Sequence, residues 1–287
     1  MSGSTVEKTL FGLEKETQRV KLAVEAGEPV LLYGPAGSGK TILAQEVAEE
    51  YSKKHGTPII YLQLYPEMTK GTLIGGETLK NGTIVVEPQV VTKRGVEGAV
   101  FIIDECTHTT EPVLLAFNSL IEEPNMTVIG HEIFKMHTDT RFIFCGNYPD
   151  HTGNIPLPTS FANRLYIEDI AHPDAEHYVK IALHYTGVDE KLATFIAKMI
   201  ERVRDDSLPI SPRNMLACAR ALERIEGTGF KPLGSKHRPT AEAKALLKVL
   251  NTKNICPETF KETVLSTLSA RVKAHTTVPD KIRALMW

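Results

Sequence analysis

The first residues that could do chemistry form a glycine-rich segment near the N-terminus. The segment runs Gly34-Pro35-Ala36-Gly37-Ser38-Gly39-Lys40-Thr41, which has the residue spacing of a P-loop. In such a loop the backbone N–H groups and the N-terminus of the following helix bind phosphate. We therefore expect the whole segment to bind a nucleotide, with Lys40 contacting the β- and γ-phosphates and the hydroxyl of Thr41 ligating Mg²⁺.

A pair of carboxylates follows an apolar run further along the chain. Residues 99–103 are Ala-Val-Phe-Ile-Ile, and Asp104 and Glu105 come directly after them. We predict that Asp104 holds Mg²⁺ through its water shell and that Glu105 polarises the attacking water as a general base. A carboxylate base beside the metal ligand suits water as the acceptor. The pair therefore favours nucleotide hydrolysis over phosphate transfer to a bound small molecule.

The elements that must position these residues alternate between short apolar runs and helical patterns. This alternation is typical of a parallel sheet flanked by helices, and runs with almost no polar residue indicate strands covered on both faces. Two dipeptides, Asn81-Gly82 and Gly130-His131, interrupt the alternation and predict two β-hairpins. The five predicted strands are residues 30–33, 59–64, 100–103, 142–145 and 165–167.

Strand signals stop near Pro173, and only helical patterns follow. Asp174 is placed to cap a helix over residues 175–186, and later helices are predicted at 211–225, 240–250 and 257–274. We expect residues 227–239 to form a loop. The predicted organisation is an α/β core over residues 1–172, with a five-stranded parallel sheet, and an all-helical domain over residues 173–287.

Composition narrows the classes of partner and compartment. The net charge of −2 disfavours binding of nucleic acid or an anionic membrane by the chain as a whole. The four cysteines are scattered and predict small buried side chains in a reducing compartment. No apolar run is long enough to cross a bilayer, and no secretory signal is visible at the N-terminus. We expect a cytoplasmic protein that binds no metal except Mg²⁺.

With these motifs in place, the sequence resembles the AAA+ superfamily over nearly its whole length. Within that superfamily it is similar to the MoxR-like group, whose relatives include CbbQ, midasin and dynein-type modules. The resemblance is carried by the P-loop, Leu73-Ile74-Gly75-Gly76, Ile103-Asp104-Glu105 and Gly146-Asn147. The two predicted hairpins fall where this group carries its helix-2 insert and its pre-sensor-1 hairpin.

The resemblance implies roles for three further residues. Asn147 matches sensor 1, which orients water beside the γ-phosphate. Arg164 matches the arginine finger, which acts on the nucleotide of a neighbouring subunit, although Leu165 follows it where the family usually has Phe. Arg213, in Ser211-Pro212-Arg213, matches sensor 2, which reaches the γ-phosphate from the helical lid.

The resemblance also implies a biological role. It indicates an ATP-hydrolysing, Mg²⁺-dependent motor that forms a homo-oligomeric ring, by analogy a hexamer. MoxR-like proteins act as chaperones that mature a client protein, often with a partner carrying a von Willebrand factor A domain, which would here be a separate polypeptide. Two alternatives stay open: a nucleic-acid motor of the MCM or McrB type, the latter using GTP, and a nucleotide-gated scaffold with little hydrolysis.

Overall fold

The computed structural model describes residues 10–123, 125–149, 153–203, 212–225, 241–253 and 255–271. The chain divides into two compact units. The first, here called the α/β unit, comprises Leu13–Pro35 and Gly39–Ala171. The second, the helical unit, is built around His172–Trp287 and also takes in Met1–Gly12 and Ala36–Ser38. The expected division between residues 172 and 173 stays a prediction.

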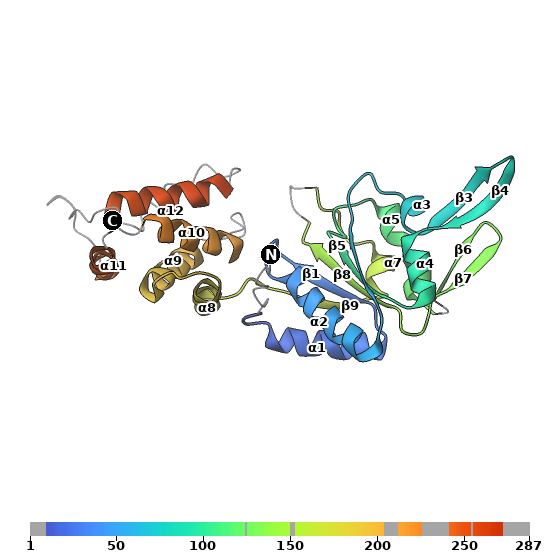
Figure 1. The fold of residues 1–287 in the computed structure, drawn as a ribbon, viewed down its shortest axis with the longest axis horizontal. Helices are drawn as coiled ribbons and strands as arrows, with labels where there is room; N and C mark the ends of the chain where they lie inside the picture. Colours follow the sequence, from blue (N-terminus) through green and yellow to red (C-terminus); the bar gives the residue numbers. More distant parts are fainter. Residues whose placement is uncertain are drawn as a thin grey trace, which may run out of the picture. The chain divides into compact units, whose positions relative to one another are not determined.

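The α/β unit is organised around one five-stranded sheet, in which every neighbouring pair of strands is parallel (Figure 1). All five predicted strands are present, so the predicted fold class is confirmed. The last strand begins one residue later than predicted and continues two residues further. In spatial order the strands are β2 (Ile59–Gln63), β5 (Val100–Asp104), β8 (Arg141–Asn147), β1 (Val30–Gly34) and β9 (Tyr166–Asp169).

The central strands are apolar because helices cover both faces of the sheet. Alternate side chains of β5 and β8, such as Phe101 and Phe144, pack with Phe117 and Phe161 in a buried cluster on one face. The helices α1 (Glu14–Ala26) and α2 (Lys40–His55) lie together on one side of the sheet (Figure 1). The remaining helices of this unit are α3 (Lys70–Leu73), α4 (Val90–Glu97), α5 (Glu111–Leu115), α6 (Asn118–Ile121) and α7 (Thr159–Ala162).

The helical pattern through residues 113–121 is divided in the structure between α5 and α6. At the junction, the N–H of Phe117 donates to the carbonyl of Leu114 at 3.0 Å, a bond to the third preceding residue. That bond belongs to a tightened turn, and side-chain spacing does not reveal such a change. Val113, Leu120 and Ile121 are nevertheless buried as the pattern predicts.

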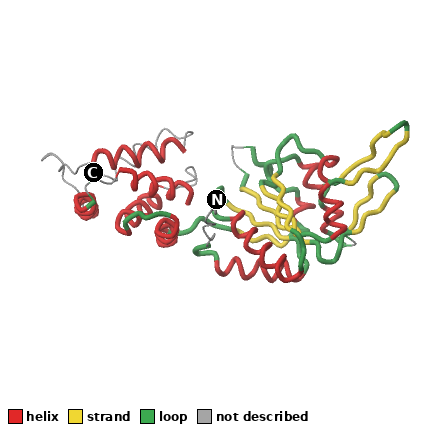
Figure 2. The backbone as a smooth tube through the Cα atoms, viewed as in Figure 1, coloured by secondary structure: helices red, strands yellow, loops and turns green. Residues whose placement is uncertain are grey.

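Both predicted hairpins are confirmed. One pairs β3 (Gly75–Lys80) with β4 (Thr83–Pro88), and the other pairs β6 (Met126–Ile129) with β7 (Glu132–Lys135). Asn81 and Gly82 have φ of 52° and 81°, which are the positive values that a two-residue primed turn requires. The hairpins extend side by side from one end of the α/β unit (Figure 2), and β6 contacts both β3 and β4.

The described part of the helical unit contains helices and no strands, as predicted. Asp174 caps its first helix, because Oδ1 of Asp174 accepts the N–H of His177 at 2.9 Å. The predictions for Ser211 and for the loop at 227–239 lie outside the described residues. The helices are α8 (Ala175–Tyr185), α9 (Glu190–Val203), α10 (Pro212–Ile225), α11 (Ala241–Thr252) and α12 (Pro257–Arg271), of which α9 was not predicted.

No helix among the described residues has both the length and the apolar character needed to span a lipid bilayer.

Candidate nucleotide site

The P-loop lies where β1 ends and α2 begins, at the carboxyl edge of the sheet. Residues 35–39 form the turn between these elements. At Gly34 an added Cβ would lie 2.2 Å from the carbonyl oxygen of Ile170, so this close approach requires glycine. Gly39 directly precedes the first residue of α2 and has φ of 102°, a value at which a residue with a side chain would be strained. The glycine spacing found in the sequence therefore serves a tight strand-to-helix turn.

Lys40 is the buried cation of this turn. Its side chain folds back over the loop, and Nζ donates to the carbonyl oxygens of Gly34 at 3.0 Å and Pro35 at 2.7 Å. Burial lowers the pKa of Lys40, and the nearby carboxylates of Glu105 and Asp104 oppose that shift. A buried ammonium in an amide-rich loop at a helix N-terminus is well suited to bind phosphate.

Thr41 and Asp104 meet although 63 residues separate them in the chain. Oγ1 of Thr41 donates to Oδ2 of Asp104 at 3.0 Å, and the backbone N–H of Glu105 donates to Oδ1 of Asp104 at 3.0 Å. The structure thus brings together the two residues predicted to bind Mg²⁺. A hydroxyl and a carboxylate are oxygen ligands of the kind that Mg²⁺ prefers, so these residues fit the ion.

Sequence reasoning missed Tyr61 at this position. The residue lies in the middle of β2, and its hydroxyl donates to the same Oδ2 of Asp104 that Thr41 contacts. Tyr61 pairs with Ile102 across the parallel strands, so its long side chain reaches the residue two places further along β5. No local signal identifies this contact, because it depends on which strand lies beside β2.

Glu105 and Asn147 form the second pair at the site. Nδ2 of Asn147, at the end of β8, donates to Oε2 of Glu105 at 2.9 Å. Glu105 has φ of 54°, an uncommon value for a residue with a side chain, and its carbonyl accepts the N–H of His108 at 2.8 Å. The turn after β5 therefore directs the Glu105 carboxylate toward the end of the neighbouring strand.

Two of the four cysteines lie behind these carboxylates. Cys106 and Cys145 are fully buried, and the N–H of Cys106 donates to the carbonyl of Cys145 at 2.8 Å. Burial raises the pKa of both thiols, so both are neutral at physiological pH. Cys218 is also buried and Cys256 is partly exposed. The prediction of buried cysteine side chains is therefore confirmed at three positions.

Arg164 lies at the opposite edge of the sheet. It precedes β9, whose first residue, Tyr166, pairs with Val30 at the amino end of β1. The P-loop begins at the other end of β1, which is 5 residues long and thus spans about 16 Å at roughly 3.3 Å per residue. Arg164 forms an ion pair with Glu122 and also donates to the carbonyl of Ser160. The structure therefore does not bring Arg164 into the site of its own subunit.

Arg213 belongs to the helical unit. It is exposed in the first turn of α10, one residue after Pro212. Asn214, which follows it, is buried in the same helix. The predicted contact of Arg213 with phosphate stays a prediction.

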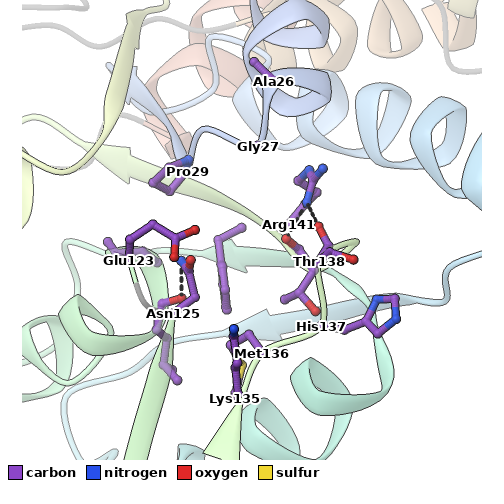
Figure 3. Close-up of a pocket in the computed structure, with 14 residues that line it drawn as sticks. Ala26, Gly27, Pro29, Glu123, Asn125, Lys135, Met136, His137, Thr138 and Arg141 are labelled. Carbon is purple, nitrogen blue, oxygen red and sulfur yellow. Dashed lines mark hydrogen bonds between the residues drawn. The ribbon is translucent and has the colours of Figure 1, made fainter.

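Two adjoining hollows lie at the amino edge of the sheet, and neither contains a residue of the P-loop. One, of about 490 Å³, is lined by Arg164 and Glu122 among others. The second, of about 330 Å³, is shown in Figure 3 and shares Pro29 and Ile121 with the first. In the second hollow, the guanidinium of Arg141 donates to the carbonyls of residues 24, 138 and 140. This arginine therefore links α1 to the segment that precedes β8.

Comparisons with known proteins agree with this geometry. Residues 29–165 match the model of the AAA domain family, dynein-related subfamily. The uncharacterized protein YojN of Bacillus subtilis is 27% identical over 178 residues, which are 60% of this chain and 57% of YojN. The gas vesicle ATPase GvpN of Ancylobacter aquaticus is 26% identical over 207 residues, which are 63% of this chain and 56% of GvpN. The chain therefore spans little more than half the length of these two relatives.

Two further proteins are similar to this chain. Midasin of Giardia intestinalis is 28% identical over 167 residues, which are 56% of this chain and 3% of midasin. A solved structure from Cytophaga hutchinsonii is 17% identical, covers 98% of this chain and 91% of its own, and has a TM-score of 0.48. Residues 29–165 are thus similar to the AAA domain family, in its dynein-related subfamily, and the parallel sheet with its P-loop agrees with that match.

Proposed function

We propose that this chain is an ATPase that hydrolyses ATP with Mg²⁺ at the carboxyl edge of the sheet. The observation that carries the proposal is the convergence of two pairs, Thr41 with Asp104 and Glu105 with Asn147, beside the loop that holds Lys40. One pair offers oxygen ligands for a metal ion, and the other offers a carboxylate base with an amide to orient it. ATPases among the similar proteins support the same reaction class.

Each side chain has a defined part in the proposed reaction. Lys40 and the backbone N–H groups of the loop bind the phosphates, and Thr41 and Asp104 hold Mg²⁺, which neutralises phosphate charge when bound. Glu105 accepts a proton from water as the water oxygen bonds to the γ-phosphorus. The bond from that phosphorus to the bridging oxygen breaks, and ADP leaves with the electron pair. Asn147 keeps Glu105 and the water in line.

We infer that Arg164 completes the site of a neighbouring copy. Its position at the amino edge, about one strand length from its own P-loop, supports action on another subunit. A planar, permanently charged guanidinium can stabilise charge that develops on transferred phosphate. The nucleotide phosphate of a neighbouring subunit would compete with the exposed carboxylate of Glu122 for Arg164, because an exposed ion pair is weak in water. By resemblance the assembly is a ring of six subunits.

The proposed work of the motor is the remodelling or maturation of a client protein, as in the MoxR-like group. The two hairpins support this role, because each carries an exposed apolar pair across its strands: Leu79 with Ile84 and Val128 with Ile133.

We propose that Arg213 senses the γ-phosphate from the helical unit and that a separate protein with a von Willebrand factor A domain assists. The cytoplasm, which supplies ATP, is the proposed location.

The proposal is tested by measuring phosphate release from ATP by the purified chain. We expect release that requires Mg²⁺, stops on addition of EDTA and falls steeply in Glu105→Gln. The matched control is Glu111→Gln, which alters an exposed glutamate in the first turn of α5 and should keep normal turnover. Parallel assays with GTP test the nucleotide preference. Turnover in Glu105→Gln equal to that of the unaltered chain would contradict the proposal.

A further inference from the structure

Thr107 is a fully buried polar residue two positions after Glu105. Its exposed fraction is 0%, and it belongs to the segment that connects β5 with α5. A buried hydroxyl is costly unless it finds hydrogen-bond partners, so its partners indicate what the residue does. Thr107 has partners in two separate segments of the chain.

The hydroxyl of Thr107 links the end of β8 to the segment that follows it. Oγ1 accepts the backbone N–H of Asn147 at 2.9 Å and donates to Oδ1 of Asn154 at 3.2 Å. The backbone carbonyl of Thr107 also accepts the N–H of Ile155 at 2.8 Å. Only a hydroxyl can accept from one of these groups and donate to the other while fitting the space of a threonine side chain.

Gly146 allows this contact by its lack of a side chain. A Cβ added at Gly146 would lie 3.0 Å from Cγ2 of Thr107 and 3.0 Å from Sγ of Cys106. The backbone of β8 can therefore approach the segment after β5 closely enough for Asn147 to reach the Thr107 hydroxyl. The hydrogen bond from Cys106 to Cys145 holds the same two segments together, one residue before Thr107 and two residues before Asn147.

We propose that Thr107 is a positioning residue for hydrolysis, which sets Asn147 so that its amide contacts Glu105. This inference rests on the proposed function, because it assigns Thr107 to the Glu105–Asn147 pair. The backbone N–H of Asn147 is held by Thr107 while Nδ2 of the same residue donates to Oε2 of Glu105 at 2.9 Å. Because the side chain starts from a backbone fixed at that point, loss of the Thr107 hydroxyl allows the amide to shift. Displacements of about 1 Å at such a site cost up to about a hundredfold in rate.

The test compares Thr107→Val, Thr107→Ser and a matched control. Thr107→Val keeps the shape and removes the hydroxyl, so we expect kcat for ATP to fall about tenfold or more while the Kd for ATP changes less than about twofold. Thr107→Ser keeps the hydroxyl and should restore most of kcat. The control is Thr92→Val on α4: Thr92 is also 0% exposed, and its hydroxyl donates to the carbonyl of Ile74 at 2.7 Å. It should keep normal kcat.

A double-variant experiment tests whether Thr107 acts through Asn147. In an Asn147→Ala background, Thr107→Val should lower kcat by less than about twofold, since the side chain that it positions is already gone. A full additional loss there would overturn the inference, as would normal kcat in Thr107→Val or equal losses in Thr107→Val and Thr92→Val. If Thr107→Val is recovered unfolded, Thr107→Ala is measured in the same way. Absence of ATP hydrolysis by the unaltered chain would instead refute the proposed function.

Discussion

The side-chain amide of Asn147 donates a hydrogen bond to the carboxylate of Glu105 at 2.9 Å, although 42 residues separate them in the chain. The contact exists because β5 and β8 are neighbours and end at the same edge of the sheet. A carboxylate that is to accept a proton from water must face that water in one orientation, and the amide supplies this restraint. The pair is therefore the most direct place to test the proposed chemistry.

Replacing Asn147 by Leu should separate binding from turnover. The substitution removes the amide and keeps the number and branching of the side-chain heavy atoms, so Glu105 loses its orienting partner while Lys40 and Thr41 are untouched. We expect kcat for ATP hydrolysis to fall about tenfold to a hundredfold with ATP affinity unchanged within about twofold. Steady-state kinetics and fluorescent-nucleotide titration measure the two quantities. A loss of affinity as large as the loss of kcat would show that Asn147 acts in binding.

Lys40→Ala and Glu105→Gln should fail in different ways. Lys40→Ala removes the buried ammonium of the P-loop and should abolish nucleotide binding. Glu105→Gln removes the proposed general base and should bind ATP normally but turn over at least about a hundredfold more slowly. Lys53→Ala, an exposed lysine in the last turn of α2, is the control and should bind normally. Equal loss of binding in both site variants would contradict the assigned roles.

Arg164→Ala should bind ATP and lose most of its hydrolysis, because the missing guanidinium is the one we propose to act on the neighbouring subunit. Mixing it with Lys40→Ala should restore part of the turnover, since some interfaces then join an intact P-loop to an intact arginine. Phosphate release across a series of mixing ratios measures the effect. Arg94→Ala, at an exposed arginine paired with Glu97, controls for general charge loss. Mixed assemblies that form but show no recovery would refute action between subunits.

The tip of the longer hairpin should matter for assembly or client work and not for nucleotide binding. Leu79 and Ile84 face each other across β3 and β4 and are 70% and 66% exposed. Changing both to Ser should leave ATP affinity unchanged within about twofold and weaken ring assembly or client activation, because an apolar contact is lost. Sedimentation with ATP and a client-activation assay measure these effects. Leu22→Ser, at an exposed leucine on α1, is the control. Unchanged behaviour of the Leu79 and Ile84 double variant in both assays would leave the hairpin without a role.

The cap of α8 should make the stability of the helical unit depend on acidity. The N–H of His177 donates to Asp174 and lowers the pKa of that carboxyl below its ordinary value. A lowered pKa in the folded state means that the stabilisation is present above pH about 4 and is lost as the pH falls through the folded pKa. Asp174→Ala should therefore cost about 0.5–2 kcal/mol at pH 7 and less at pH 3. Circular-dichroism denaturation at both pH values measures the difference.

An Asp174→Asn variant controls for the charge in that experiment. Asparagine also accepts a hydrogen bond at a helix N-terminus, so this variant should retain much of the stability at pH 7 and depend less on pH. If Asp174→Ala costs the same free energy at pH 7 and at pH 3, the ionised form of the cap is not the source of the stabilisation.

The sequence by itself determined those features that depend on a few neighbouring residues. Apolar runs such as residues 100–103 can be stable only where both faces are covered, and a P-loop needs glycine where its backbone turns sharply. Asn81-Gly82 specifies its own turn, because both residues tolerate positive φ. For the same reason the candidate chemistry of Lys40, Thr41 and the Asp104-Glu105 pair could be predicted without a structure.

The tertiary structure decided which of these features meet. The spatial order β2-β5-β8-β1-β9 places β8 between β5 and β1, and that order alone brings Asn147 to Glu105 and Tyr61 to Asp104. Because β9 runs parallel to β1, Arg164, which precedes β9, lies at the amino edge of the sheet and away from the P-loop. Local spacing carries no such information, because the free energy that selects strand neighbours comes from side chains packed across the whole core. Thr107 shows this most clearly. No local pattern in the sequence marks this threonine, and it links two segments of the chain only once the sheet has formed.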